Sequence, residues 1–286
     1  MRVRGLTKTY GQKRAVDGVD LDVAVGETLA MLGPNGAGKT TTVEVLEGYR
    51  RADAGEIRVL GEDPAVGGPA WRARLGIVLQ TATDAAELTV AETVHHFARY
   101  YPAPRDADEV IAAVGLEDKR RARVRALSGG QRRRLDVALG IVGDPELLFL
   151  DEPTTGFDPQ ARRHFWDLVA HLKSGGTTIL LTTHYLEEAE RLADRVAVIN
   201  QGRLLDVATP SRLGGRDASV AVVSWSDADG PHEKATRAPA TLVTELAARA
   251  GGEVADLEVR RPSLEDVYLQ MISAESPALD REEVPA

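Results

Sequence analysis

The chain has 286 residues, of which 43% are hydrophobic, so it can bury a sizeable core in one large domain or two smaller ones. Because it contains no cysteine, disulfides, cysteine-based zinc sites and thiol nucleophiles are excluded. The net charge of −9 argues against broad electrostatic binding to nucleic acid, so we expect no nucleic-acid partner. No apolar run approaches the roughly 18 residues that cross a bilayer and the first residues lack a signal-peptide pattern, which predicts a cytoplasmic protein.

The N-terminal region has the pattern of short strands separated by glycines. Residues 1–6, 15–23 and 27–32 are the expected strands. Tyr10 lies between the first two strands. From the local sequence it either stacks on an adenine ring or anchors a hairpin on the sheet.

Residues 33–40 fit the pattern Gly-x-x-x-x-Gly-Lys-Ser/Thr, between the expected strand 27–32 and an expected helix at 40–48. In this motif the loop N–H groups surround phosphates, Lys39 supplies a cation for the β- and γ-phosphates, and the Thr40 hydroxyl is placed to ligate Mg²⁺. The alternative is a glycine-rich turn with a surface lysine, but the strand–loop–helix context favours a nucleotide site. The candidate nucleotide-binding residues are Tyr10, Gly33, Pro34, Asn35, Gly36, Ala37, Gly38, Lys39, Thr40 and Thr41.

A helical region follows two strand-like segments, 55–61 and 75–80, the second of which ends in Gln80. Helices are expected at 90–101, 106–114 and 131–142, the first of them with a capping box made by Thr89 and Glu92. Because strand-like segments bound this region on both sides, we interpret residues 81–143 as a helical subdomain inserted into a sheet.

The last of these helices opens with the sequence Leu127-Ser128-Gly129-Gly130-Gln131. A helix that begins at Ser128 with two glycines can bind an anion at its N-terminus. The simpler alternative is an ordinary cap followed by a solvated face made of Arg132, Arg133 and Arg134. Taken alone, the motif favours this simpler alternative.

Residues 146–152 form an apolar run that ends in Asp151 and Glu152, as expected for a buried parallel strand with carboxylates at its C-terminal end. Asp151 would hold Mg²⁺, and Glu152 would orient and deprotonate an attacking water; the alternative is two solvated acids in a turn. A helix at 159–173 and a strand at 177–183 follow, and the strand delivers His184 at its end. A lone histidine after a strand is more often structural than catalytic; the alternative at this sheet edge is a hydrogen bond to the γ-phosphate. With a strand at 195–200, the alternation predicts an α/β fold whose ligand binds at the carboxyl ends of a mainly parallel sheet.

The pattern changes after about residue 205. A strand at 219–225, a turn at 227–230, a helix at 241–250, a strand at 256–260 and a helix from Ser263 to 271 predict a small α+β appendage. The expected organisation is therefore a domain at 1–204, a second domain at 205–273 and a disordered tail at 274–286.

Together these motifs resemble the nucleotide-binding subunit of ATP-binding cassette (ABC) transporters over about residues 1–202. Residues 33–40 are similar to the Walker A loop, 147–151 to the Walker B strand followed by the catalytic glutamate Glu152, and 127–131 to the ABC signature. Gln80, Asp158 and His184 resemble the Q-loop, D-loop and switch residues, although Phe157 stands where the family usually has leucine. The resemblance implies a P-loop NTPase ABC cassette with an N-terminal antiparallel β subdomain, ATP and Mg²⁺ as cofactors, and Thr40, Gln80 and Asp151 at the Mg²⁺.

The resemblance also implies a dimer, in which Lys39, Glu152 and His184 of one cassette act with the signature of a second. That signature comprises Leu127, Ser128, Gly129, Gly130 and Gln131. Residues 262–269 resemble the ending of daunorubicin-resistance-type exporter ATPases, although a capped amphipathic helix that packs on the appendage explains them too.

The implied function is ATP hydrolysis that powers export of a drug, antibiotic or lipid through a separate polytopic membrane permease, at the cytoplasmic face of the plasma membrane. The alternatives are an importer ATPase, an ATPase that remodels ribosomes or nucleic acid, and a nucleotide-binding scaffold without turnover.

Overall fold

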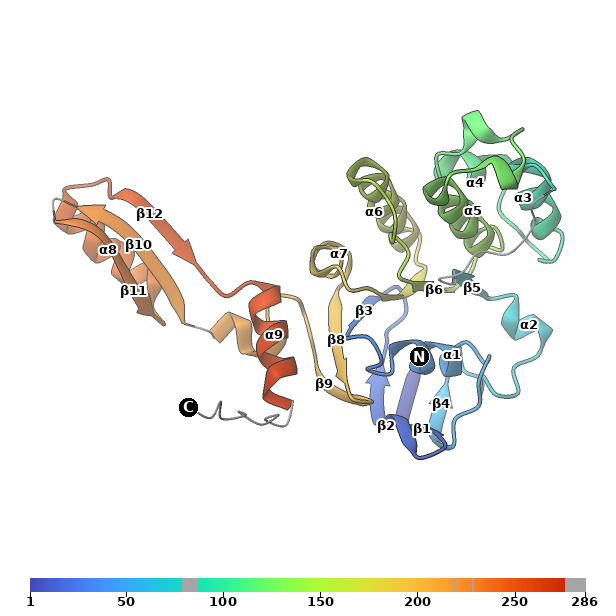
Figure 1. Ribbon diagram of the computed structural model, residues 1–286, viewed down its shortest axis with the longest axis horizontal. Helices are drawn as coiled ribbons and strands as arrows, with labels where there is room; N and C mark the ends of the chain where they lie inside the picture. The colour runs from blue at the N-terminus through green and yellow to red at the C-terminus, as the bar shows by residue number, and fades with distance from the viewer. Residues whose placement is uncertain (79–86, 219, 228, 276–286) are drawn as a thin grey trace, which may run out of the picture. The chain divides into compact units, whose positions relative to one another are not determined.

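The computed structural model describes residues 1–78, 87–218, 220–227 and 229–275. The chain divides into two compact units, Met1–Val207 and Ala208–Ala286, and the colour bar of Figure 1 locates both by residue number. The division lies after Val207, near the end of β9 (Arg203–Ala208), a strand that the sequence analysis did not anticipate and that extends past the expected boundary at residue 204.

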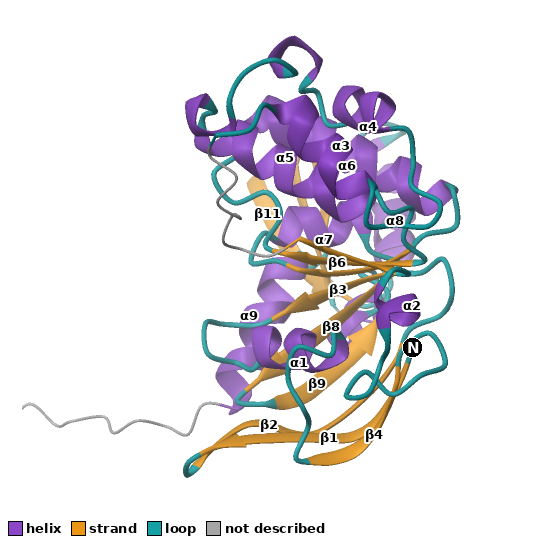
Figure 2. Cartoon of the chain, turned by 90° about the vertical axis from the view of Figure 1, so that its right-hand side faces the viewer, coloured by secondary structure: helices purple, strands orange, loops and turns teal. Residues whose placement is uncertain are grey.

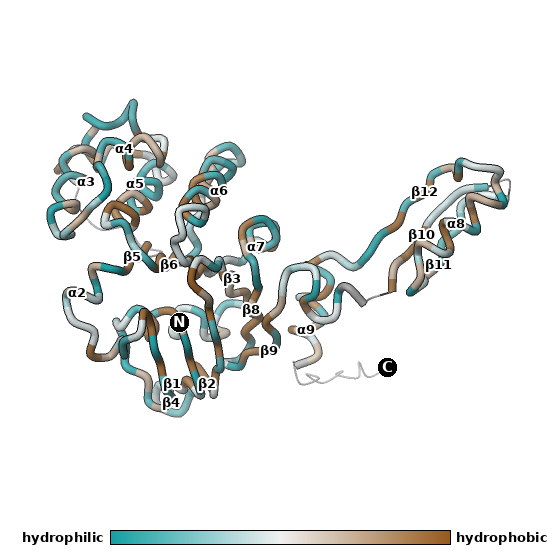
Figure 3. The backbone as a smooth tube through the Cα atoms, turned by 180° about the vertical axis from the view of Figure 1, so that it is seen from behind, coloured by the Kyte–Doolittle hydropathy of each residue, from teal (hydrophilic) through white to brown (hydrophobic). Residues whose placement is uncertain are grey.

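Six strands form the central sheet of the first unit in the order β5-β6-β7-β3-β8-β9. Besides β9 they are β3 (Thr28–Leu32), β5 (Leu75–Val78), β6 (Leu147–Asp151), β7 (Thr178–Thr182) and β8 (Arg195–Asn200). The neighbours from β5 to β8 pair in parallel, which confirms the mainly parallel sheet. Every residue of β3, β6 and β7 is buried, as expected of strands covered on both faces. Figure 3 colours the chain by hydropathy and shows brown, hydrophobic stretches in the central sheet.

An antiparallel sheet made from the N-terminal region packs against this core. It contains β1 (Arg2–Tyr10), β2 (Lys13–Asp22) and β4 (Ala54–Arg58) in the order β2-β1-β4. Val3 and Leu6 of this sheet share one buried cluster with Leu29, Met31 and Phe149 of the central sheet. Figure 2 shows β1, β2 and β4 below the strands of the central sheet.

The predicted helical subdomain is present, with α3 (Val90–Ala98), α4 (Ala107–Ala113) and α5 (Gly129–Ile141) packed together (Figure 1). It also contains two short 3₁₀ helices, η1 (Glu117–Lys119) and η2 (Val124–Ala126). The capping box predicted at Thr89 is confirmed, since its hydroxyl accepts a hydrogen bond from the N–H of Glu92 and the Glu92 carboxylate accepts one from the N–H of Thr89.

The remaining helices of the first unit are α1 (Lys39–Leu46), α2 (Pro69–Arg72), α6 (Pro159–Ser174) and α7 (Leu186–Leu192). Of these, α1 and α6 were predicted, and α2 and α7 were not. Helix α7 packs on α6 and on β3. It therefore places the segment that follows β7 close to the centre of the sheet.

The second unit contains a three-stranded antiparallel sheet in the order β11-β10-β12. Its elements are η3 (Leu213–Ala218), β10 (Ala221–Asp227), β11 (Gly230–Thr236), α8 (Pro239–Ala250), β12 (Ala255–Arg260) and α9 (Leu264–Glu275). Helix α8 packs on β10, where Val223, Leu242 and Leu246 form a small buried cluster. Helix α9 reaches Glu275, and the rest of the predicted tail lies outside the described residues.

Candidate functional site

The loop between β3 and α1 is fixed by close backbone contacts with neighbouring strands. A Cβ atom at Gly33 would lie 2.3 Å from the carbonyl oxygen of Ile199, so only glycine fits there. Gly38 has a φ of 107°, and a Cβ on it would lie 2.4 Å from the carbonyl oxygen of Ala15. The N–H of Gly202 donates a 2.8 Å hydrogen bond to the carbonyl of Ala37. The loop is therefore held in shape by the fold itself.

The other predicted loop positions are open to solvent to different degrees. Asn35, Gly36 and Thr40 are exposed, and Pro34 and Thr41 are half-buried. Because α1 starts directly behind Gly38, its first N–H groups and the positive end of its dipole are directed at the loop. This is the arrangement that binds phosphate groups in proteins.

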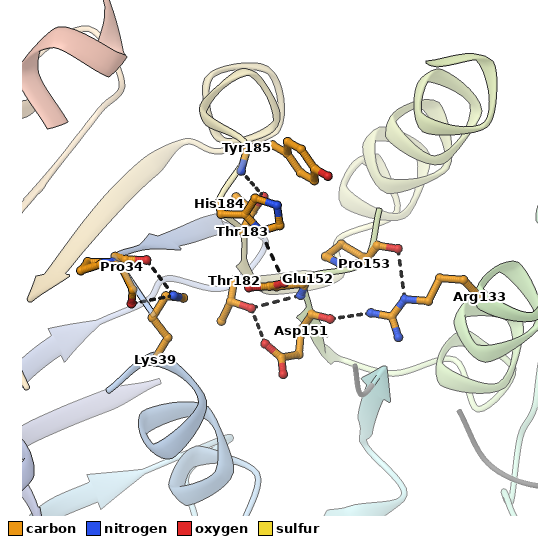
Figure 4. A network of polar contacts seen from close by, with 11 residues as sticks. Pro34, Lys39, Arg133, Asp151, Glu152, Pro153, Thr182, Thr183, His184 and Tyr185 are labelled. Carbon is orange, nitrogen blue, oxygen red and sulfur yellow. Dashed lines mark hydrogen bonds and ion pairs between the residues drawn. The ribbon is translucent and has the colours of Figure 1, made fainter. Parts of the chain in front are cut away.

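Lys39 is a buried cation at the centre of this loop, with 7% of its surface exposed. Its Nζ donates hydrogen bonds to the carbonyl oxygens of Gly33 (2.7 Å) and Pro34 (3.2 Å). Burial lowers the pKa of the ammonium group, and the negative charges of Glu152 and Asp151 oppose that shift. Figure 4 shows Lys39 on one side of a polar network whose other members include both acids.

Asp151 is the last residue of β6, and Thr182 is the last residue of the adjacent β7, directly beside it in the parallel register. The hydroxyl of Thr182 donates a 2.5 Å hydrogen bond to Oδ1 of Asp151. Since β7 is also the neighbour of β3, three adjacent strands bring the phosphate loop and the acids to the same carboxyl edge of the sheet.

Glu152 has an unusual backbone conformation for a residue that carries a side chain, with a φ of 46°. Such conformations cost of order 1–3 kcal/mol and persist where the surrounding structure enforces them. Its N–H donates to the carbonyl of Thr182 at 3.1 Å. Its Oε2 lies 3.4 Å from Nδ1 of His184, so the structure brings these two predicted residues together (Figure 4).

Tyr10 lies at the end of β1 with 42% of its surface exposed. Its ring centroid is 5.7 Å from the Lys8 ammonium and 5.6 Å from the Arg50 guanidinium. A ring this exposed is not a buried hairpin anchor, which favours the interpretation as a stacking platform.

Ser128 caps helix α5, as the sequence predicts. Its hydroxyl accepts from the N–H of Gln131, and the Gln131 side chain accepts from the N–H of Ser128. Leu127 is buried, Gly129 and Gly130 lie in the first turn, and a Cβ on Gly130 would lie 3.8 Å from the carbonyl oxygen of Gly156. In the described part of the chain, no hydrogen bond joins residues 127–131 to the phosphate loop.

Asp158 caps helix α6, because its carboxylate accepts a 2.8 Å hydrogen bond from the N–H of Ala161. The adjacent Phe157 is buried and makes an edge-on contact with Phe165, at 6.0 Å between ring centroids. This contact explains why an aromatic residue fits where the sequence pattern usually has leucine.

Two of the three predicted Mg²⁺ ligands lie in the described part of the chain. The Thr40 hydroxyl in the exposed first turn of α1 and the carboxylate of Asp151 are oxygen donors of the kind that Mg²⁺ prefers. The third, Gln80, lies outside the described residues.

The predicted solvated face of three arginines is wrong for Arg133. This residue is only 7% exposed, and its guanidinium donates hydrogen bonds to the carbonyls of Asp151 and Pro153. Positions 133, 137, 140 and 141 of α5 are all buried. A charged residue on the buried stripe of a helix is the signal that sequence analysis could have used.

These contacts place the protein among the P-loop nucleotide-binding proteins, and the inserted helical subdomain with its capped glycine turn narrows the class to ATP-binding cassettes. Similarity to known proteins supports the same class. Residues 16–155 match the sequence pattern of the ABC transporter family.

Two relatives cover nearly the whole chain. The daunorubicin resistance ATP-binding protein DrrA3 of Streptomyces coeruleorubidus is 41% identical, over 94% of both chains. The Nod factor export ATP-binding protein I of Ralstonia nicotianae is 42% identical, over 92% of this chain and 82% of that protein.

Solved structures share the fold. An ATP-binding subunit of an ABC transporter superposes with a TM-score of 0.72 at 23% identity, over 94% of this chain and 98% of that one. A dimeric bacterial ABC transporter cassette gives a TM-score of 0.66 at 23% identity, over 73% of this chain and 97% of that one. The chain therefore belongs to the ABC transporter family, as an ATP-binding subunit with ATPase activity of the daunorubicin-resistance type.

Proposed function

We propose that this chain hydrolyses Mg²⁺-bound ATP between two of its copies and thereby drives export through a separate membrane permease. The observation that carries the proposal is the convergence of Lys39, Asp151, Glu152 and His184 at one sheet edge (Figure 4). The capped N-terminus of α5 belongs instead to the helical subdomain. One copy then supplies the phosphate loop and the acids, and the other supplies residues 127–131.

Within one copy, each side chain has a separate task. The loop 33–41 holds the phosphates, Lys39 neutralises the β- and γ-phosphates, and Tyr10 stacks on the adenine. Glu152 orients and deprotonates the attacking water, which is worth roughly 10²–10⁴-fold in rate for general-base catalysis. His184, at 3.4 Å from Glu152, hydrogen-bonds the γ-phosphate.

Thr40, Asp151 and Gln80 would hold Mg²⁺, which neutralises charge on the phosphate oxygens. The chemistry of the donors fits this role, because a hydroxyl and a carboxylate are oxygen ligands of the kind that Mg²⁺ takes.

The second copy would complete the site with the N-terminus of α5. Its unpaired N–H groups and the positive end of its dipole stabilise charge on the γ-phosphate as the copies close. Asp158, which caps α6, belongs to the loop that would meet the partner. A homodimer is the simplest assembly that supplies both halves.

Export of a drug, antibiotic or lipid is supported by relatives named for daunorubicin resistance and for Nod factor export. Residues 262–269 span the start of α9, where Leu264 and Val267 are buried within the second unit. These residues therefore also fit the alternative interpretation, in which they form a capped amphipathic helix that packs on the rest of the appendage. A permease partner would place this chain at the cytoplasmic face of the plasma membrane. Recovery of ribosomes or nucleic acid in place of a membrane protein would favour the remodelling alternative.

The test compares the wild-type protein with Glu152→Gln and Lys39→Ala. Glu152→Gln should bind ATP and form stable dimers with Mg²⁺-ATP, yet release phosphate at least about 100-fold more slowly. Lys39→Ala should stay monomeric with ATP. Light scattering after size exclusion and a phosphate-release assay measure both, and unchanged turnover of Glu152→Gln would remove Glu152 from its role.

A further inference from the structure

Arg133 makes contacts that the proposed roles do not use. It lies in the second turn of α5, and its side chain reaches the turn that follows β6. Nη2 donates to the carbonyl oxygen of Asp151, and Nε donates to the carbonyl oxygen of Pro153 at 3.1 Å. These two carbonyls belong to the residues on either side of Glu152. Figure 4 shows the guanidinium facing them.

A buried guanidinium is costly unless charges and hydrogen bonds compensate for its lost hydration. Burial lowers the pKa of Arg133, whereas Asp136, Asp151, Glu152 and Glu188 raise it, the first of these most strongly. A planar guanidinium with fixed donors can bridge two carbonyls, which a single ammonium group cannot do with the same geometry. The side chain is therefore matched to the shape of this turn as well as to its charge.

The turn that Arg133 contacts contains Glu152, the residue with the strained backbone. Glu152 adopts a φ of 46°, and its N–H is held by Thr182 on β7. Arg133 also accounts for the carbonyls before and after Glu152, so hydrogen bonds hold the backbone of this turn at three points. The backbone in turn fixes the direction of the Glu152 side chain toward His184. Displacement of a catalytic group by about 1 Å can cost on the order of 100-fold in rate.

We propose that Arg133 is a positioning residue that keeps Glu152 aimed at the attacking water and ties that aim to helix α5. Arg133 and the cap Ser128 belong to the same helix, five residues apart in sequence. A shift of α5 when its N-terminus meets a phosphate of the partner's ATP would therefore reach the Glu152 turn directly. This inference rests on the proposed roles of Glu152 and of the α5 N-terminus.

The test compares Arg133→Met and Arg133→Lys with the matched control Arg134→Met. Arg134 is the next residue of the same helix, and its Nη1 donates to the carbonyl of Gly115, outside the turn, at 2.8 Å. Arg133→Met should lower kcat by about 10–100-fold and change ATP affinity by less than about threefold. Arg133→Lys should recover part of the rate, and Arg134→Met should stay within about threefold of the wild type.

Two further measurements separate positioning from general support of the fold. The melting temperatures identify any variant that loses rate through unfolding, and Arg133→Lys keeps the charge if Arg133→Met folds poorly. In a Glu152→Gln background, Arg133→Met should leave ATP-dependent dimers intact, because the residue acts through Glu152.

A wild-type kcat in Arg133→Met, or an equal loss of kcat and ATP affinity in Arg133→Met and Arg134→Met, would overturn the proposal. If Glu152→Gln itself turned over normally, the proposed function would fail and this inference with it. A slow Glu152→Gln with a fast Arg133→Met would refute the inference alone.

Discussion

Lys39 lies near the two acids at the carboxyl edge of the sheet: burial lowers the pKa of its ammonium group, and the negative charges of Glu152 and Asp151 oppose that shift. Lys39 uses its hydrogen bonds on the loop carbonyls of Gly33 and Pro34, so a phosphate would meet an ammonium that is already oriented. Charge-assisted hydrogen bonds of this kind contribute about 1.5–3 kcal/mol each.

Lys39→Ala should therefore weaken ATP binding by at least about tenfold. Equilibrium titration with a fluorescent ATP analogue measures the effect. Lys119→Ala, which removes an exposed lysine in η1, is the control and should bind as the wild type does. Wild-type affinity in Lys39→Ala would count against the phosphate loop.

Glu47 follows α1 and is only 7% exposed. Burial, with the negative charges of Asp151 and Glu44, raises its pKa from 4.5 to about 8. Between these values the folded chain keeps a proton that the unfolded chain releases, so this contribution to stability is lost as the pH rises from about 4.5 to about 8.

Glu47→Gln should therefore be more stable than the wild type at pH 8, by about 1–3 kcal/mol. The advantage should shrink toward zero near pH 5, and each kcal/mol corresponds to roughly 2–4 °C in melting temperature. Thermal melts at both pH values measure it, with the exposed Glu56→Gln as control. An equal shift at both pH values would show that Glu47 is ionised alike in both states.

Single residues of the site were predictable where a motif fixes their role. The phosphate loop, Asp151, Glu152 and His184 follow from spacing and from strand ends, and the structure brings them to one edge. The contact of Arg133 was not predictable, because its carbonyl acceptors lie 18 and 20 residues further along the chain. Only the packing of α5 on the catalytic turn creates it.

At the scale of elements, two helices of the helical subdomain begin with the same device. Thr89 caps α3 and Ser128 caps α5, each with a complete capping box. A cap of this kind contributes about 1 kcal/mol to stability. If residues 127–131 act on a partner's ATP, only one of the two caps also serves catalysis.

Thr89→Ala and Ser128→Ala should each lower the free energy of unfolding by about 1 kcal/mol. Only Ser128→Ala should lower kcat as well, by about tenfold or more, because it removes a donor from the γ-phosphate site. Urea unfolding and phosphate release measure the two effects separately. An equal loss of activity in both variants would mean that the signature acts only through the stability of the subdomain.

Buried strands of the core were predictable because their apolar runs are uninterrupted, as in β6 and β7. Strand β11 was missed because most of its side chains are exposed and its sequence has no alternating apolar pattern. Helix α7 was missed because it has only seven residues, and its buried Glu188 interrupts the apolar pattern that its packing on β3 requires.

At the scale of the whole molecule, the first unit carries every described residue of the proposed site, and the second has a small core of its own. In the described residues, no helix has the length and apolar character needed to cross a membrane. The division into two units was predictable from the change of pattern near residue 205, whereas its position after Val207 depends on β9.

The central claim is that each ATP site needs two copies, and complementation tests it most directly. Lys39→Ala keeps an intact signature and Ser128→Ala keeps an intact phosphate loop, so each variant alone should hydrolyse ATP slowly. When the two variants are mixed in equal amounts, a dimer that pairs them has one complete site, so activity should rise well above the mean of the two separate rates. A mixture that stays at the mean of the two separate rates would contradict the claim.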